Sequence, residues 1–394
     1  MAALPRPLAV ACLVGLLAAL AATPARALDD ERYHAASAAI DRAVAYLRDA
    51  QNDDGSWSPE PAGPAITAMI VLAMIEQPGI SDSDPAVDAG VEFLLDHVQD
   101  DGGIYDRILA NYNTAISLST LAELTHRPGV SEAVAGAQAF LRELQWSVGD
   151  VDPQGNPIDE SHPFYGGVGY GNHGRPDLSN VQTMVQALYD SGVACDDPAY
   201  QQAVAFISRL QGHDANDMFD ADTVERDGGF IYATSIDSDH IGTPQSMANP
   251  DQVERGREGQ PVSGLRSYGS MTYAGFKSYL YADLDRDDPR VLAALDWIRD
   301  NYTLERNPGM PADVQHQGLY YYYHTFARAL HAWGEPTIAT AAGEQRRWRA
   351  DLVDQLLELQ NDDGSWTNPA DRWMEGDPNL TTAYALLALT YALR

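Results

Sequence analysis

The chain has 394 residues, of which 45% are apolar and 21% charged, enough for one large repeat-built domain or two of average size. Lys and Arg number 25 against 57 Asp and Glu, so the formal net charge is −32. A surface this acidic repels phosphate backbones and anionic lipid head groups, and we therefore expect no nucleic-acid partner. Solubility or adaptation to high salt explains the charge more simply than specific cation binding. The only lysine is Lys277.

The first residues have the pattern of a signal peptide. Arg6 gives a positive start, residues 8–22 are apolar, and residues 25–27 form the small-x-small cleavage site Ala-Arg-Ala. This pattern predicts a signal peptide over residues 1–27, cleavage after Ala27, and a protein that is secreted or periplasmic.

The remaining residues, 28–394, are predicted to form a single domain. No segment in them is apolar for long enough to form a stable membrane span. Cys12 is removed with the signal peptide, so Cys195 is the only cysteine left. A single cysteine excludes an internal disulfide and a cysteine-based metal cluster.

The first predicted helix, over residues 40–50, is amphipathic and is followed by the heptapeptide QNDDGSW at 51–57. A second helix, almost entirely apolar, is predicted over 65–76. A helix with one charged face lies at the surface, whereas a helix that is apolar all round is buried. The pattern therefore predicts an outer helix, a turn and an inner helix.

The same unit recurs along the chain, and QNDDGSW is repeated unchanged at 360–366. Outer helices are predicted over 40–50, 85–98, 132–144, 199–210, 289–301 and 348–359. Inner helices are predicted over 65–76, 113–124, 178–190, 271–283, 317–333 and 381–393. Six pairs suit a closed ring, which leaves no open end to cap. We therefore predict an all-α fold, an (α/α)6 toroid of six outer and six inner helices.

The turn residues are predicted to be structural. The amide of Gln51 stands where the outer helix ends and can bond the unpaired backbone groups there. Gly55 permits the sharp reversal of the chain, and the apolar ring of Trp57 packs the turn against the neighbouring repeat. Asn301 stands near the glutamine position in the fifth repeat. The other repeats keep the glutamine, as Gln51, Gln99, Gln145, Gln211 and Gln360.

This turn resembles the QW motif of squalene–hopene cyclases and the related repeat of protein prenyltransferase β subunits. The resemblance extends over the whole of residues 28–394. It implies a terpenoid-cyclase-like or prenyltransferase-like ring around a largely apolar central cavity. Because a fold does not fix a function, the catalytic residues of these families have to be sought position by position.

Cyclases that begin by protonation carry a DxDD acid at the start of an inner helix. The chain contains Asp-Arg-Asp-Asp at 285–288, but Pro289 follows, and the segment opens an outer helix. An aspartate followed by proline is the ordinary N-cap of a helix. No predicted inner helix has an acid directly before its first threonine, so the resemblance does not extend to the cyclase acid.

Prenyltransferases hold a zinc ion with Asp, Cys and His at the starts of inner helices. His324 matches the histidine, but Ser270 and Thr272 stand where the aspartate and cysteine belong. One ligand out of three does not hold zinc, and we predict no metal and no cofactor. The related thioester proteins need Cys-Gly-Glu-Gln, and residues 342–345 have alanine in place of that cysteine.

The predicted topology places all outer-to-inner loops on one rim of the ring, where the inner helices begin. The four long insertions, 147–177, 212–268, 302–317 and 367–379, belong to this rim. Long loops are often functional, and helix N-termini favour a polar or anionic ligand group. The alternative is that the loops merely cover the core.

The same rim collects aromatic and polar side chains, with the densest cluster at residues 320–324. An apolar cavity with a few polar groups is the usual form of a ligand site. The alternative is that the tyrosines simply pack the centre of the ring. The predicted ligand-binding residues are Tyr112, Asn113, Tyr170, Asn180, Gln182, Tyr268, Met271, Tyr320, Tyr322, Tyr323 and Trp373. His324 and His173 are the candidates for acid–base catalysis.

These observations favour an exported toroid that binds or processes an isoprenoid or another hydrophobic small molecule. A divergent cyclase or transferase would convert this ligand. A carrier would hold it unchanged. A third hypothesis is a cell-envelope scaffold that binds other proteins on its acidic outer face.

Overall fold

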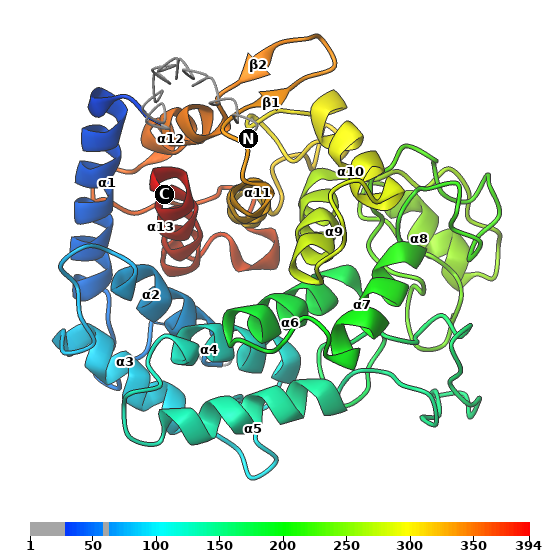
Figure 1. Ribbon diagram of the computed structural model, residues 1–394, viewed down its shortest axis with the longest axis horizontal. Helices are drawn as coiled ribbons and strands as arrows, with labels where there is room; N and C mark the ends of the chain where they lie inside the picture. Colours follow the sequence, from blue (N-terminus) through cyan, green and yellow to red (C-terminus); the bar gives the residue numbers. More distant parts are fainter. Residues whose placement is uncertain (1–27, 58–62) are drawn as a thin grey trace, which may run out of the picture.

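The computed structural model describes residues 28–57 and 63–394, so the predicted signal peptide lies outside the described residues. Its helices alternate between an outer and an inner ring (Figure 1). The outer helices are α1 (Asp30–Asp49), α3 (Pro85–Leu95), α5 (Val130–Glu143), α7 (Pro198–Arg209), α10 (Pro289–Asp300) and α12 (Trp348–Leu359). The inner helices are α2 (Ala65–Ile75), α4 (Ala110–Ala122), α6 (Leu178–Asp190), α9 (Gly269–Tyr281), α11 (Leu319–Trp333) and α13 (Pro378–Leu393).

The inner helices form a closed circle. Each packs on the next in the order α2, α4, α6, α9, α11 and α13, and α13 packs back on α2. The outer helices surround this circle, and α1 contacts α12 where the first and last repeats meet. The predicted all-α (α/α)6 toroid is confirmed.

The difference in composition between paired helices sets their positions. In α2, nine of 11 residues are buried, whereas in α1 only six of 20 are. Burying a Leu, Ile or Met side chain contributes roughly 1.5–3 kcal/mol, so an all-apolar helix is driven into the interior. An amphipathic helix covers it and keeps its charged face in water.

The repeated turn holds neighbouring repeats together. Gln51 and Trp57 have each other's predicted role. The indole of Trp57 donates to the Leu47 carbonyl, which lies in the last turn of α1 and lacks a helical partner. The Gln51 amide instead donates to the carbonyl of Ala86, in the first turn of the next outer helix. The expectation that Gln51 caps its own helix is therefore wrong, because the tryptophan occupies that place.

The last repeat uses the same bond to close the ring. Gln360 donates at 2.9 Å to the carbonyl of Ala39 in α1, as well as to Gly364 in its own turn. The glycine of the turn has a left-handed backbone and lies against the next helix. At Gly55, φ is +85°, and an added Cβ would lie 2.4 Å from the Ala89 carbonyl oxygen. Only glycine fits this contact.

Several elements differ from the prediction. Helix α1 begins ten residues before 40, because Asp29 caps it by accepting from the Arg32 amide. The second insertion contains a short helix, α8 (Pro250–Arg257), and a hairpin of β1 (Ile338–Ala339) and β2 (Gln345–Arg346) precedes α12. A 3-10 turn, η1 (Arg372–Met374), lies in the last insertion. The Asp-rich 285–288 segment ends in Asp288, which caps α10 as predicted.

Candidate functional site

A cavity of about 380 Å³ lies at the end of the ring where the inner helices begin. All six inner helices contribute a residue from their first two turns, so the cavity lies on the axis of the toroid. Its walls from the helices are Ala65, Ile66, Met69, Tyr112, Ile116, Ser179, Ser270, Met271, Tyr321, Leu380 and Tyr384. The helix N-termini point their free amide dipoles at this end of the ring.

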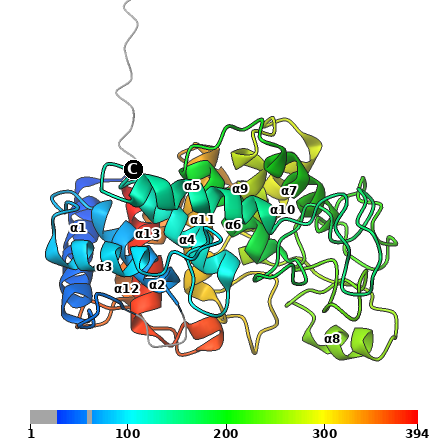
Figure 2. The same ribbon diagram turned by 90° about the horizontal axis from the view of Figure 1, so that it is seen from below.

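The insertions complete the cavity from outside the ring. Figure 2 shows α8, in the second insertion, on the side of the ring opposite the C-terminus. The lining residues from the insertions are Tyr170, Tyr232, Met247, Tyr268, Trp373, Met374 and Glu375. Leu109 and Gly318, which directly precede α4 and α11, complete the lining. Trp373 has a left-handed backbone, φ 58°, and its ring packs on the bare backbone of Gly318. This tryptophan is 45% exposed and forms part of the cavity edge.

Tyrosine side chains form much of the cavity wall and contribute most of its hydroxyl groups. The rings of Tyr112 and Tyr170 stack with centroids 5.7 Å apart, and the hydroxyls of Tyr170 and Tyr232 are 3.0 Å apart. Burial raises the pKa of Tyr112, Tyr232 and Tyr268 well above the usual 10. These phenols are therefore neutral at physiological pH and act as hydrogen-bonding groups rather than anions.

Glu375 is the only carboxyl group among the lining residues, and sequence reasoning missed it. Its side chain is almost fully buried, at 1% exposure, and accepts from the Tyr321 backbone amide at 2.8 Å and from the Asn368 amide group at 2.6 Å. Burial raises its pKa to about 7, against these hydrogen bonds, which lower it. A carboxyl group in this range exchanges its proton near neutral pH.

Five of the predicted ligand-binding residues line the cavity, as far as the structure describes it. They are Tyr112, Tyr170, Tyr268, Met271 and Trp373. These side chains come from two inner helices and three insertions, and the fold brings them together around one space. The cavity thus lies on the rim where the inner helices begin, which is the rim that the predicted topology indicated.

The predicted amide residues lie outside the lining, in buried hydrogen-bond networks. The Asn113 side chain accepts from the Ala65 amide and so joins the starts of α2 and α4. Asn180 accepts from the side chain of Asn111 and donates to Asp177. Gln182 lies directly behind the wall, where its amide donates to the hydroxyl of Tyr321 at 3.0 Å.

The tyrosine side chains at the start of α11 do not all point into the cavity. Tyr321 faces the cavity, whereas Tyr320, Tyr322 and Tyr323 lie outside the lining. The hydroxyls of Tyr322 and Tyr323 donate at 2.7 Å to the carbonyls of Thr303 and Leu304. Those two side chains therefore anchor the insertion at 302–317.

The structure places neither candidate histidine in the cavity lining. His324 is buried beside Tyr384, with ring centroids 5.5 Å apart, and its Nε2 has no hydrogen-bond partner within the described ranges. Burial lowers its pKa well below 6.5, and the positive charges of Arg328 and Lys277 lower it further. His173 packs its ring on Trp146 at 4.8 Å.

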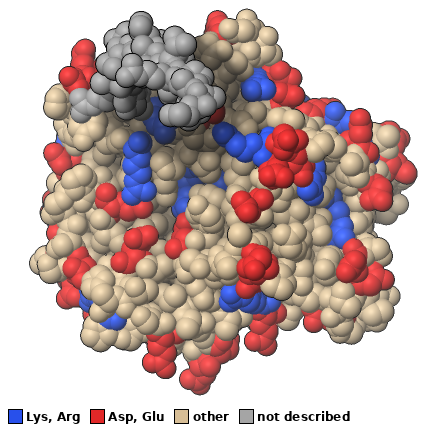
Figure 3. Space-filling model, in the orientation of Figure 1, with Lys and Arg blue, Asp and Glu red and all other residues tan. Residues whose placement is uncertain are grey.

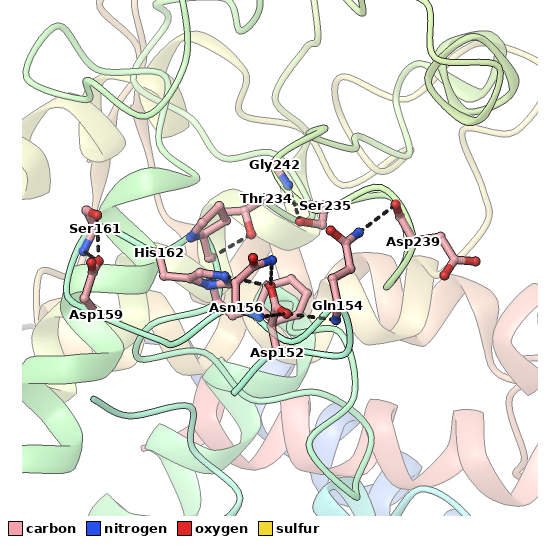
Figure 4. Close-up of polar contacts among 12 residues, drawn as sticks. Asp152, Gln154, Asn156, Asp159, Ser161, His162, Thr234, Ser235, Asp239 and Gly242 are labelled. Carbon is pink, nitrogen blue, oxygen red and sulfur yellow. Dashed lines mark hydrogen bonds and ion pairs between the residues drawn. The ribbon is translucent and has the colours of Figure 1, made fainter. Parts of the chain in front are cut away.

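A hydrogen-bond network around the buried Asp152 ties the first two insertions together outside the cavity (Figure 4). The carboxylate of Asp152 accepts from the backbone and side chain of Asn156 and from His162 at 3.1 Å. Burial opposes its ionisation, but these hydrogen bonds outweigh it and lower the pKa of Asp152 to about 2. Gln154 donates to the Asp239 carbonyl in the second insertion. Because its pKa lies far below neutral pH, Asp152 stays ionised and is a structural group.

A second cavity, of about 280 Å³, lies at the opposite end of the ring. It is bordered by the C-terminal ends of the inner helices, on the face shown in Figure 3. Its charged groups largely pair with one another, since Arg328 contacts Asp190 at 2.7 Å and Arg394 contacts Glu76 at 3.2 Å. The apolar, aromatic cavity at the other end is therefore the stronger candidate for a ligand site.

Within the described residues, no group of three or more His, Cys, Asp or Glu side chains has an arrangement that holds a metal ion. In the same part of the chain, no helix is long and apolar enough to cross a membrane. The two findings concern residues 28–57 and 63–394 alone.

No family model matches the chain, and no curated protein matches its sequence. Solved structures do match in fold. D-mannose isomerase aligns with a TM-score of 0.54 at 12% identity, over 94% of this chain and 98% of its own. A possible member of the GH105 family from Salmonella enterica aligns with a TM-score of 0.55 at 11% identity, over 92% and 94%.

A type II terpene cyclase from Scytonema also aligns, at 15% identity over 93% of this chain and 99% of its own, with a TM-score of 0.35. The fold is thus shared with the D-mannose isomerase and with the possible GH105 member. Similarity at these identities concerns the fold, and the function has to be argued from the cavity.

Proposed function

We propose that this protein binds a compact, mainly apolar small molecule in the cavity at the N-terminal ends of the inner helices. The observation that carries the proposal is the lining: tyrosine, methionine, leucine, isoleucine and tryptophan side chains enclose it, with one carboxyl group. The polar groups of this lining are tyrosine and serine hydroxyls and one carboxyl group, and most of its surface is apolar, whereas sugars present hydroxyls on all sides. A hydrophobic ligand, isoprenoid or of another skeleton, suits it better.

The volume limits the size of this ligand. A cavity of about 380 Å³ has room for on the order of a dozen water molecules. A ligand with a similar number of non-hydrogen atoms fills the cavity, whereas a triterpene such as squalene would extend out of it. The proposed relationship to squalene cyclases and prenyltransferases therefore concerns the repeat architecture, with a smaller ligand.

Glu375 favours a converting enzyme over a carrier as the role of this site. It is the one lining group that gives up and takes back a proton near neutral pH, with its pKa near 7. We assign it the acid–base role first sought in His324 and His173, which lie outside the lining. A secreted or periplasmic carrier remains the alternative function, and a cell-envelope scaffold is the third.

Mass spectrometry of the purified protein, before and after incubation with candidate ligands, separates these functions. A converted ligand supports the enzyme, an unchanged ligand the carrier, and a co-purifying protein with an empty cavity the scaffold. Glu375→Gln is expected to abolish conversion while the ligand still binds. If Glu375→Gln converts the ligand at the wild-type rate, the assignment of Glu375 is wrong.

Direct binding tests the cavity itself. Trp373→Ala removes a half-exposed part of the cavity edge, and we expect the affinity for an apolar ligand to fall by about tenfold from the lost apolar contact. The matched control is Trp333→Ala, because Trp333 lies at the other end of α11, outside the lining. Equal affinities of both variants and the wild type would place the ligand elsewhere.

A further inference from the structure

The only lysine of the chain lies inside the ring. Lys277 on α9 is fully buried and has no carboxylate within ion-pair distance among the described residues. Its ammonium or amine nitrogen instead donates to the side-chain oxygens of Gln182 at 2.6 Å and Gln186 at 2.5 Å, both on α6. Burial, together with the nearby charge of Arg328, lowers the pKa of Lys277 well below 10.5. Burying a lysine without a counter-ion destabilises the folded state. The contacts of Lys277 indicate what this residue does in the structure.

The first consequence of these contacts is the orientation of Gln182. Because Lys277 donates to the Gln182 oxygen, the NH₂ end of that amide is turned the other way. There it donates to the hydroxyl oxygen of Tyr321 at 3.0 Å and to the hydroxyl of Thr183 at 2.8 Å. A lysine ammonium offers donors only, and a neutral lysine amine still has two hydrogens, one for each of the two glutamine oxygens.

The second consequence concerns Tyr321, which lines the cavity. Its hydroxyl oxygen accepts from Gln182, and its hydrogen has no acceptor in the described part of the chain. A hydroxyl whose oxygen is occupied from behind directs its hydrogen to the open side. The cavity thus contains a hydrogen-bond donor that lacks an acceptor.

A second lining residue repeats this arrangement from another part of the chain. The Ser270 hydroxyl accepts from the side chain of Asn307 at 3.1 Å, and it too has no acceptor for its hydrogen within the described residues. Asn307 is 1% exposed and also accepts from the Ser270 backbone amide, which fixes its orientation. Two independent buried amides therefore prepare hydroxyl donors for the same cavity.

We infer that the ligand of this cavity carries an acceptor oxygen, such as a ketone, aldehyde or ether, on a compact apolar skeleton. Lys277 is a positioning residue: through Gln182 it keeps the hydroxyl of Tyr321 a donor towards the ligand. A hydrocarbon of the same shape leaves these donors without partners in an apolar space, which is unfavourable. The inference rests on the proposed function and adds the chemical class of the ligand.

Indane and 2-indanone form a matched pair of probes, because they differ only in one ring carbon that carries hydrogens or a carbonyl oxygen. Both are measured by isothermal titration calorimetry against the wild type, Tyr321→Phe, Lys277→Met and Tyr189→Phe. The result of interest is the ratio of the two affinities in each protein. A variant with general damage loses affinity for both probes and leaves this ratio unchanged.

We expect Tyr321→Phe to weaken 2-indanone by about three- to tenfold, the effect of one neutral hydrogen bond, while indane binds as before. Lys277→Met is expected to change the ratio in the same direction, because the Gln182 amide can then turn and accept from Tyr321. Tyr189→Phe is the control, since Tyr189 is 51% exposed and borders the second cavity, at the opposite end of the ring.

The outcomes separate the two proposals. If both probes bind but the ratio is the same in Tyr321→Phe and the wild type, the acceptor-oxygen inference is overturned and the binding function stands. If only Lys277→Met leaves the ratio unchanged, the positioning role of Lys277 is overturned. If neither probe binds the wild type, the proposed ligand cavity fails, and the inference fails with it.

Discussion

Replacing Glu375 by glutamine tests the electrostatics of the cavity through stability alone. The pKa of this carboxyl group is about 7 in the folded protein and 4.5 as the reference value. Below pH 4.5 both states hold the proton, and above pH 7 neither does. Between these values the unfolded chain releases its proton first, so the wild type loses stability as the pH rises through this window.

The size of the effect follows from the two pKa values. A difference of about 2.5 units corresponds to about 3 kcal/mol, at about 1.4 kcal/mol for each unit. The glutamine in the Glu375→Gln variant does not titrate, so the variant does not lose this stability as the pH rises. Its NH₂ group faces the Asn368 side chain, which adds a destabilisation of about 1–2 kcal/mol that is the same at every pH. The difference between variant and wild type therefore moves by about 3 kcal/mol in favour of the variant between pH 4.5 and 8.

Urea denaturation followed by tryptophan fluorescence at pH 4.5, 5.5, 6.5 and 8 measures this difference. Other titrating groups are present in both proteins and cancel. Glu305→Gln is the control, because the Glu305 side chain is 83% exposed and meets water in both states. A difference between Glu375→Gln and the wild type that stays constant with pH would refute the buried, proton-binding carboxyl group.

Three further predictions concern the scaffold. Gly55→Ala should destabilise the protein by about 1–3 kcal/mol more than Gly79→Ala in urea denaturation, because both have positive φ but only the former meets a backbone carbonyl; equal losses would contradict the inter-repeat contact. Tyr322→Phe should cost about 1 kcal/mol and speed hydrogen exchange over residues 302–317; unchanged exchange there would mean that the hydroxyl does not anchor the insertion. Wild-type protection of the first insertion should fall as the pH drops from about 4 towards 2, whereas Asp152→Asn should exchange fast throughout.

The architecture could be predicted because its causes are local and repeated. The turn at 51–57 recurs at 360–366, and helices differ plainly in how much of their surface is apolar. The partner of each turn glutamine could not be predicted, because it lies in another repeat. Gln51 contacts Ala86, 35 residues further on, and no pattern within the turn indicates that carbonyl.

The position of the cavity could be predicted, but not the set of residues that line it. Successive helix residues point about 100° apart, so the four tyrosines at 320–323 cannot all face one cavity. Composition alone does not show that Tyr321 is the one that does. Glu375 gave no signal, because a single glutamate in a loop acquires its role only by meeting Tyr321, 54 residues away in sequence. Lys277 did give one, as the only lysine in an acidic chain.

The bond from Gln360 to Ala39 has a consequence for how the molecule comes apart. In an open solenoid the terminal repeat touches one neighbour and can fray by itself. Here every repeat touches two, so none is released until contacts on both of its sides have broken. Opening is then a rare, concerted event, and the folded molecule should persist for longer than its equilibrium stability alone suggests. Such slow opening would also delay digestion by proteases.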